Sequence, residues 1–356
     1  MSDEINYFRR RFCGAAAMTV AAAVNAHIHA QSGDTGDTGD TPRSGDESQT
    51  AKATATNASF ASIKQINAGA LSIGYAEDGP ANGPAVILLH GWPYDIHTYV
   101  GVAPLLAAKG YRVIVPHLRG YGSTRFLSAS TARNGQQAVL GLDVIALMDA
   151  LEIDKPIVAG CDWGARTAGI VAALWPERCK ALVSVSGYLI GSREVNKKPL
   201  PPEAELQWWY QYYFATERGR AGYETYRREF SKLIWRLASP KWKFDDATFD
   251  RSAASFDNPD HVAIVIHNYR WRLGLAEGEP QYDALESKLA EGPPITVPTI
   301  TLEGDANGAP HPPPAAYAKK FTGKYAHRDL TGGIGHNLPQ EAPQAFATAI
   351  IDADGF

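Results

Sequence analysis

Asp162 is the residue whose type and position point most directly to chemistry. It lies in segment 158–166, VAGCDWGAR, where an apolar run ends in a Gly-x-Asp-x-Gly turn and continues as a helix. Small residues flank the nucleophile in a strand–turn–helix elbow because the turn leaves no room for side chains. A carboxylate there attacks carbon and forms an ester, which favours opening epoxides or displacing halide over cleaving peptides. The following helix would keep the carboxylate ionised.

A second motif, His90-Gly-Trp-Pro93, follows the apolar run 85–90. An ester on Asp162 needs hydrogen-bond donors aimed at the oxyanion that develops when the ester is attacked. We expect the backbone N–H groups of Trp92 and Trp163 to form this oxyanion hole, since Gly91 permits a close approach. Taken alone, the second motif also suits an ordinary turn, and Asp162 alone suits a helix cap.

A third motif, Gly332-Gly-Ile-Gly-His-Asn337, offers the general base. His336 follows a predicted strand, 325–330, and precedes a predicted final helix, 341–352, which suits a histidine that activates water. A further group should orient the imidazole. The predicted strand 299–304 and the loop after it offer Asp305 or Asn307, with Glu303 as a weaker option.

Strands and helices alternate along the chain from residue 62. Short apolar runs predict strands at 63–66, 71–77, 85–90, 111–115, 156–159, 181–185, 299–304 and 325–330. Helical spacing predicts helices at 98–109, 136–151, 165–174 and 341–352. This alternation predicts an α/β fold with a mostly parallel sheet that helices cover on both faces.

The N-terminal residues predict export instead of folded structure. Phe8-Arg-Arg-Arg-Phe12 precedes a small apolar run, so residues 1–30 are similar to a twin-arginine signal peptide, which implies export machinery as a partner and a periplasmic or secreted location. A basic N-terminus of a cytoplasmic protein is the alternative. Residues 31–59 contain three Gly-Asp-Thr repeats and few apolar residues, which predicts a disordered linker.

Composition excludes several function classes. The formal net charge is −4 and the basic residues form no stripe along the sequence, which argues against nucleic acid as a partner. No apolar run approaches the roughly 18 residues of a membrane span. Cys13 lies in the predicted signal, and we expect Cys161 and Cys179 to be buried thiols.

Together, the Asp162 elbow, His90-Gly-Trp-Pro93, Arg119-Gly-Tyr-Gly-Ser123 and the His336 loop resemble the α/β-hydrolase superfamily, in its epoxide hydrolase and dehalogenase branch, and soluble epoxide hydrolases most of all. The resemblance covers about residues 60–356. It implies an α/β-hydrolase core at 60–190 and 291–356 with an inserted helical cap at 191–290. It also implies a small apolar substrate, no metal and no organic cofactor.

The resemblance extends to two tyrosines of the cap. Trp209-Tyr-Gln-Tyr-Tyr-Phe214 is similar to the first cap helix of soluble epoxide hydrolases, and His267-Asn-Tyr-Arg-Trp271 to the second cap motif. Tyr210 and Tyr269 would then hydrogen-bond the epoxide oxygen and supply a proton as the ring opens. Gln211 beside Tyr210 is a candidate for substrate binding.

This chain departs from the family pattern at three positions. The family acid aligns with Asn307, which would hold His336 but stabilise its cation poorly, while Asp305 lies two residues early. His117 stands where the family usually has aspartate, which suggests a structural role. Arg166 lies one helical turn beyond Asp162, where fluoroacetate dehalogenases bind a carboxylate, although a surface ion pair would explain it equally well.

The sequence therefore predicts an epoxide hydrolase. Asp162 would form an alkyl-enzyme ester, and water activated by His336 would hydrolyse it to a diol. The alternatives are a haloalkane or haloacid dehalogenase that uses the same nucleophile, and a non-catalytic binding protein that retains the fold. Asn307 is the main support for the binding protein.

Overall fold

The computed structural model describes residues 59–309 and 311–356. The predicted export signal, Cys13 and all of the predicted linker except Ser59 lie outside the described residues. Among the helices within these two ranges, none has the length and apolar character needed to cross a membrane.

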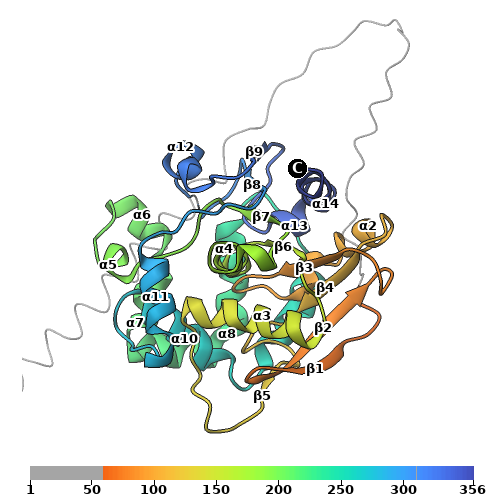
Figure 1. Ribbon diagram of the computed structural model, residues 1–356. Helices are drawn as coiled ribbons and strands as arrows, with labels where there is room; N and C mark the ends of the chain where they lie inside the picture. Colours follow the sequence, from red (N-terminus) through yellow and green to blue (C-terminus); the bar gives the residue numbers. More distant parts are fainter. Residues whose placement is uncertain (1–58, 310) are drawn as a thin grey trace, which may run out of the picture. The chain divides into compact units, whose positions relative to one another are not determined.

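A single nine-stranded sheet forms the centre of the fold (Figure 1). The strand order is β1-β2-β4-β3-β6-β7-β8-β9, and β5 pairs with β2. The first two strands pair antiparallel, as do β2 and β4, whereas all pairs from β4 to β9 are parallel, which confirms the predicted mostly parallel sheet. The strands are β1 (Lys64–Ala68), β2 (Leu71–Asp78), β3 (Ala85–Leu89), β4 (Arg112–Pro116), β5 (Arg125–Phe126), β6 (Ile157–Gly160), β7 (Ala181–Val185), β8 (Thr299–Gly304) and β9 (Tyr325–Leu330).

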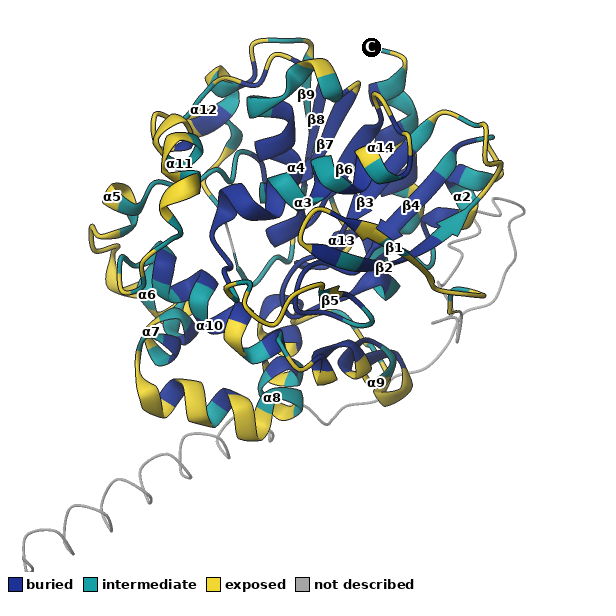
Figure 2. Ribbon diagram, turned by 60° about the horizontal axis from the view of Figure 1, so that its bottom comes forward, coloured by how far each residue is buried: buried dark blue, intermediate teal, exposed yellow. Residues whose placement is uncertain are grey.

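Helices cover both faces of this sheet, as Figures 1 and 2 show. Helices α3 (Gln137–Ala150) and α4 (Trp163–Leu174) lie on one face, and α2 (Ala103–Ala107) and α14 (Pro343–Asp354) lie on the other. Successive residues of a strand point to opposite faces. Ile87 of β3 therefore joins the apolar cluster with α3, while its neighbour Val86 joins the cluster with α14. Burial on both faces explains why the strands are short continuous apolar runs.

Seven helices fill the segment predicted to be the cap, between β7 and β8. They are α5 (Arg193–Asn196), α6 (Pro202–Gln207), α7 (Trp209–Ala215), α8 (Glu217–Ala238), α9 (Asp246–Ala253), α10 (His261–Arg272) and α11 (Asp283–Ala290). Side chains cap two of them: the Thr216 hydroxyl accepts the Gly219 N–H in α8, and the Asp245 carboxylate accepts the Thr248 N–H in α9.

Proline changes two of the predicted helices. Residues 98–109 form a 3-10 turn, η2 (Ile96–Tyr99), and the short α2 in place of one helix. Pro104 lacks an N–H group and fits only in a first helical turn, so a new helix begins beside it. Pro343 likewise separates α13 (Leu338–Glu341) from α14. Cys161 and Cys179 are free and buried, as predicted.

The packing of α4 against β3 predicts opposite effects for two glycines in one helix. A Cβ atom on Gly164 would lie 1.7 Å from the Leu89 carbonyl oxygen, so Gly164→Ala should lower the free energy of unfolding by about 1–3 kcal/mol or more. On Gly169 the nearest atoms would be 3.9 Å away, and alanine there should stabilise the helix by up to about 1 kcal/mol. Urea unfolding followed by circular dichroism measures the free energy of unfolding of both variants. An unchanged value for Gly164→Ala would contradict the close approach of Gly164 to the Leu89 carbonyl.

Candidate active site

Asp162 occupies a strained backbone turn between β6 and α4. Its φ of 55° and ψ of −119° lie in a region that residues other than glycine rarely adopt, and such strain gathers at functional sites. The neighbouring backbone packs tightly around it. A Cβ on Gly91 would lie 2.4 Å from the Asp162 Cβ, and a Cβ on Gly160 would lie 2.2 Å from the Gly164 carbonyl carbon. The chain therefore forms the predicted elbow, with the carboxylate at its tip.

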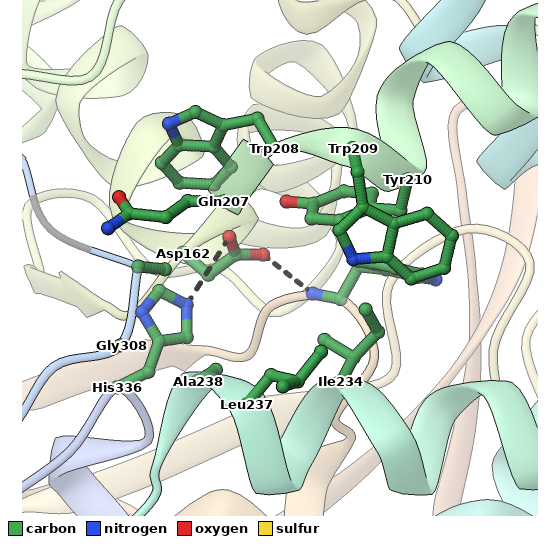
Figure 3. Close-up of a pocket in the computed structure, with 12 residues that line it drawn as sticks. Asp162, Gln207, Trp208, Trp209, Tyr210, Ile234, Leu237, Ala238, Gly308 and His336 are labelled. Carbon is green, nitrogen blue, oxygen red and sulfur yellow. Dashed lines mark hydrogen bonds and ion pairs between the residues drawn. The ribbon is translucent and has the colours of Figure 1, made fainter. Parts of the chain in front are cut away.

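Two groups hold the Asp162 carboxylate (Figure 3). The Trp92 backbone N–H donates to Oδ1 at 2.7 Å, and the His336 Nε2 lies 3.6 Å from Oδ2. Burial alone would raise the pKa of Asp162, but the hydrogen bond and charge of His336, then the charge of Arg166 and the Trp92 N–H, lower it below its ordinary value. The Asp162 carboxylate is thus ionised, and its side chain stays 15% exposed towards the cavities described below.

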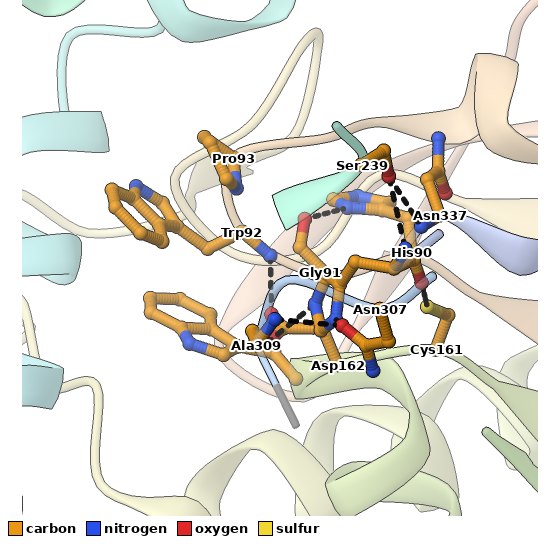
Figure 4. A network of polar contacts seen from close by, with 12 residues as sticks. His90, Gly91, Trp92, Pro93, Cys161, Asp162, Ser239, Asn307, Ala309 and Asn337 are labelled. Atoms are coloured by element: carbon orange, nitrogen blue, oxygen red, sulfur yellow. Dashed lines mark hydrogen bonds and ion pairs between the residues drawn. The ribbon is translucent and has the colours of Figure 1, made fainter. Parts of the chain in front are cut away.

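Asn307 orients the imidazole of His336 in this structure. The imidazole Nδ1 lies 3.2 Å from the Asn307 Oδ1, on a side chain that Figure 4 shows beside Asp162. The Asn307 amide donates to the Glu303 carboxylate at 2.7 Å. The same Oδ1 accepts the Ala309 N–H, so both contacts fix which end of the amide faces the ring. An oxygen can only accept, so Nδ1 carries the proton and Nε2 faces Asp162 with a lone pair when the ring is neutral.

Asp305, the other candidate, does not reach the imidazole. Its carboxylate accepts the backbone N–H groups of Gly332, Gly333 and Ile334 at 3.1, 2.8 and 3.0 Å. The predicted catalytic role of Asp305 is therefore wrong for this geometry, because all these bonds run to the loop backbone that leads to His336. Asp305 fixes the position of that loop, and Asn307 takes the contact with the ring.

The pKa of His336 depends on the charge of Asp162. Burial lowers this pKa, but the hydrogen bond and charge of Asp162, followed by the charges of Glu303 and Glu341, raise it above its ordinary value. Ester formation on Asp162 would remove the largest of these raising contributions. The imidazole then loses its main electrostatic support for the protonated form, which suits a base that acts only after the ester has formed.

The two predicted tyrosines lie together above the nucleophile. The Tyr210 and Tyr269 rings meet edge to face with centroids 5.4 Å apart, and Figure 3 shows the Tyr210 hydroxyl directed towards Asp162. Burial is the main cause that raises the pKa of both phenols, so both remain protonated donors. The Trp163 indole N–H donates to the Tyr269 hydroxyl at 3.3 Å, which leaves the phenol proton free to be donated elsewhere.

A polar chain joins the oxyanion loop to the cap. The indole N–H of Trp92 donates to the Tyr223 hydroxyl at 2.9 Å, and that hydroxyl contacts His261 Nε2 at 2.8 Å. His261 Nδ1 in turn contacts the Gly120 carbonyl at 2.9 Å, so the ring bridges α10 and the core. Burial lowers the pKa of His261 to about 3, which keeps this bridging ring neutral.

Two cavities meet at Asp162, Trp208 and Tyr210. The smaller, of about 30 Å³, is also lined by His336, and its volume suits one water molecule. The larger, of about 550 Å³, includes Arg166 and Gln211, the predicted binding residues. The expected apolar pocket is only partly correct, because Arg166, Lys198, Arg272 and Lys320 also line the larger cavity. Tyr269 lines neither cavity, and its ring packs edge to face against that of Tyr210.

The match to known proteins agrees with this geometry. Residues 84–226 match a family described as the alpha/beta hydrolase fold. A crystal structure from Klebsiella pneumoniae subsp. pneumoniae, provisionally named an epoxide hydrolase, shares 65% identity over 83% of this chain and 98% of that chain, with a TM-score of 0.83. The chain belongs to the α/β-hydrolase superfamily. This relative places the hydrolase in the epoxide hydrolase branch.

Curated relatives match a shorter part of this hydrolase. Epoxide hydrolase B of Mycobacterium tuberculosis is 33% identical over 149 residues, which are 38% of this chain and 41% of that protein. A haloalkane dehalogenase of Mycobacterium marinum is 32% identical over 127 residues, 35% of this chain and 41% of that protein. The chain thus spans about two fifths of the length of these curated relatives.

Sequence reasoning missed two residues of the hydrolase cavity and undervalued a third. Arg272 lies three residues beyond Tyr269 in α10, so helical spacing alone places both on one face and could have identified it. His311 lines the larger cavity from a loop with no periodic signal. Glu303 was the weaker option for the orienting group: it accepts the Asn307 amide instead of contacting the ring, and its charge raises the pKa of His336.

Changes at Glu303 and Asn307 should move the pKa of His336 in opposite directions. Glu303→Gln should lower this pKa, because the Glu303 charge is one of those that raise it. Asn307→Asp alone would place the new carboxylate against that of Glu303 at the present 2.7 Å contact, where one of the two would hold a proton. The double variant Glu303→Gln/Asn307→Asp keeps a hydrogen bond at this contact and sets one carboxylate against the ring, so it should raise the pKa of His336.

NMR titration of the imidazole measures all three variants against the unaltered protein. A pKa of His336 that does not respond to Glu303→Gln would refute a polarising role for Glu303 through Asn307.

Proposed function

We propose that this protein is an epoxide hydrolase that works through an ester on Asp162. The phenol that faces Asp162 carries the proposal. An opening epoxide becomes an alkoxide and needs a proton, which the protonated Tyr210 can give while Tyr269 packs edge to face against its ring. The epoxide hydrolases among the relatives support the same activity.

In the first step the Asp162 carboxylate attacks an epoxide carbon. A bond forms between the carboxylate oxygen and that carbon, and the ring carbon–oxygen bond breaks. The electron pair stays on the ring oxygen, which takes a proton from Tyr210, supported by Tyr269 at 5.4 Å between ring centroids. The products of this step are a hydroxyalkyl ester of Asp162 and a tyrosinate.

In the second step water attacks the ester carbonyl. The cavity beside His336 has about 30 Å³ for this water, and Nε2 takes its proton. The N–H groups of Trp92 and Trp163 stabilise the tetrahedral oxyanion, since Trp163 is the first residue of α4 and its N–H has no partner within the helix.

Collapse of this intermediate releases the diol and restores the enzyme. The ester bond breaks, and the new carboxylic acid of Asp162 gives its proton to the leaving alkoxide. The imidazolium of His336 returns its proton through solvent to the tyrosinate. The sum is one epoxide and one water converted to one diol.

A dehalogenase is the second candidate, since a haloalkane dehalogenase is among the relatives. A departing halide needs N–H donors and no proton. The indole N–H groups of Trp92 and Trp163 already donate to Tyr223 and Tyr269, whereas Trp208 and Trp209 also bring indole groups to the smaller cavity. Release of halide that is lost in Trp163→Phe would instead support the dehalogenase.

The ester itself provides the direct test by intact-protein mass spectrometry. With styrene oxide and glycidamide, His336→Gln should accumulate an adduct with the mass of one epoxide, because loss of a general base slows hydrolysis about a hundredfold or more. Asp162→Ala should show no adduct, and His327→Gln, which changes a histidine on β9 outside the site, should turn over normally. Absence of both adduct and diol would favour the non-catalytic binding protein.

The ester should also accumulate as the pH falls. Ester formation needs an ionised Asp162, and its lowered pKa keeps the carboxylate charged well into the acid range. Ester hydrolysis needs a neutral His336, so it slows as the pH falls through the pKa of that ring in the ester, where the raising contribution of Asp162 is lost. Quenched-flow mass spectrometry from neutral to acid pH measures both steps. An ester fraction that stays constant would contradict the assignment of His336 as base.

Export remains a separate proposal. The paired arginines and the small apolar run of residues 1–30 support a periplasmic or secreted location.

A further inference from the structure

The larger cavity at Asp162 carries an excess of positive charge. Apart from the nucleophile, its lining includes Arg166, Lys198, Arg272 and Lys320 but only one other acidic residue, Glu291. Its volume of about 550 Å³ falls in the range of small-molecule sites. An apolar epoxide would gain nothing from these charges, so their presence calls for an explanation from the substrate.

Arg166 is held at the wall of this cavity without an acidic partner. It lies one helical turn after Asp162, and its backbone N–H donates to the Asp162 carbonyl at 3.0 Å. Its Nε donates to the Leu189 carbonyl at 3.0 Å, which fixes the guanidinium. Within residues 59–309 and 311–356, Arg166 forms no ion pair with a carboxylate.

Arg272 brings a second guanidinium to the same wall. It lies over the Tyr269 ring at 5.6 Å and, in the part of the chain that the structure describes, also lacks an ion pair. Burial and then the charge of Arg272 lower the pKa of Arg166 to about 10, so the two cations oppose each other. His311 lines the same cavity, and its buried Nδ1 has no hydrogen-bond partner among the described residues.

This arrangement differs from the way the chain buries an arginine elsewhere. Arg119 is only 4% exposed, and Asp143 accepts from its Nε and Nη2 at 2.6 and 2.7 Å. Two partly buried guanidinium groups without such a partner destabilise each other unless an anion binds between them. The carboxylate whose charge acts on Arg166 is Asp162, and this charge disappears when the ester forms.

We propose that the substrate is an epoxide that carries a carboxylate, and that Arg166 and Arg272 bind this carboxylate while Asp162 attacks the ring. This proposal rests on the proposed epoxide hydrolase function. A guanidinium matches a carboxylate with two parallel hydrogen bonds, and the donor at His311 adds to them. The substrate carboxylate also supplies the negative charge that the cavity loses when Asp162 becomes an ester.

Glycidate and glycidamide provide a matched test, because they share a skeleton and differ in charge. The full-length protein should have a higher kcat/KM for glycidate than for glycidamide. Arg166→Gln and Arg272→Gln should each lower the ratio of the two values by about tenfold to a hundredfold, the value of a charged hydrogen bond. Arg218→Gln removes the same charge from an exposed position of α8 and should keep the ratio.

The outcomes separate this inference from the function on which it rests. Turnover of glycidamide with no preference for glycidate, or a ratio that neither cavity variant changes, would overturn the carboxylate site and leave the epoxide hydrolase intact. Failure of both compounds to give a diol or an ester on Asp162 would overturn both proposals. The ratio is an internal control, since a variant that only folds poorly loses both activities together.

Discussion

The Asp162 carboxylate lies where three stretches of backbone meet with no side chain between them. Glycine at positions 91, 160 and 164 leaves the space, since a Cβ at any of them would lie within 2.4 Å of another atom. That contact brings the Trp92 N–H to 2.7 Å from the carboxylate and sets the start of α4 beside it. One packing constraint thus positions the Asp162 carboxylate, the Trp92 N–H and the start of α4 together.

Because a neutral amide, that of Asn307, contacts the His336 ring, the pKa of this ring depends mainly on the charge of Asp162. With Asn307 against the ring, Asp162 supplies the largest contribution that raises the pKa of His336. The protonation of the ring therefore responds to whether Asp162 is free or esterified. A carboxylate at position 307 would favour the imidazolium in both states and weaken that response.

The fold and the elbow at Asp162 were predictable because local patterns determine them. Buried parallel strands are continuous apolar runs, and the Asp162 elbow needs small residues at fixed positions. The choice between Asp305 and Asn307 was not predictable, since both follow β8 and only the path of the loop decides which one reaches the ring. Only part of the helix predicted at 98–109 forms, as α2 after the 3-10 turn η2, because its apolar spacing conceals the effect of Pro104. The charge of the larger cavity arises from α4, α10 and loops that only the fold brings together.

The chain from Trp92 through Tyr223 to His261 has a consequence for how such enzymes diversify. Trp92 donates its backbone N–H to the Asp162 carboxylate and its indole N–H to a hydroxyl of the cap. Half of the proposed oxyanion hole therefore depends on a residue of the inserted segment. A cap transplanted from another member of the superfamily would bring a new pocket, but it would loosen catalysis unless it also carried a hydroxyl to meet this indole. In this chain the cap and the core are matched to each other at the contact between Trp92 and Tyr223.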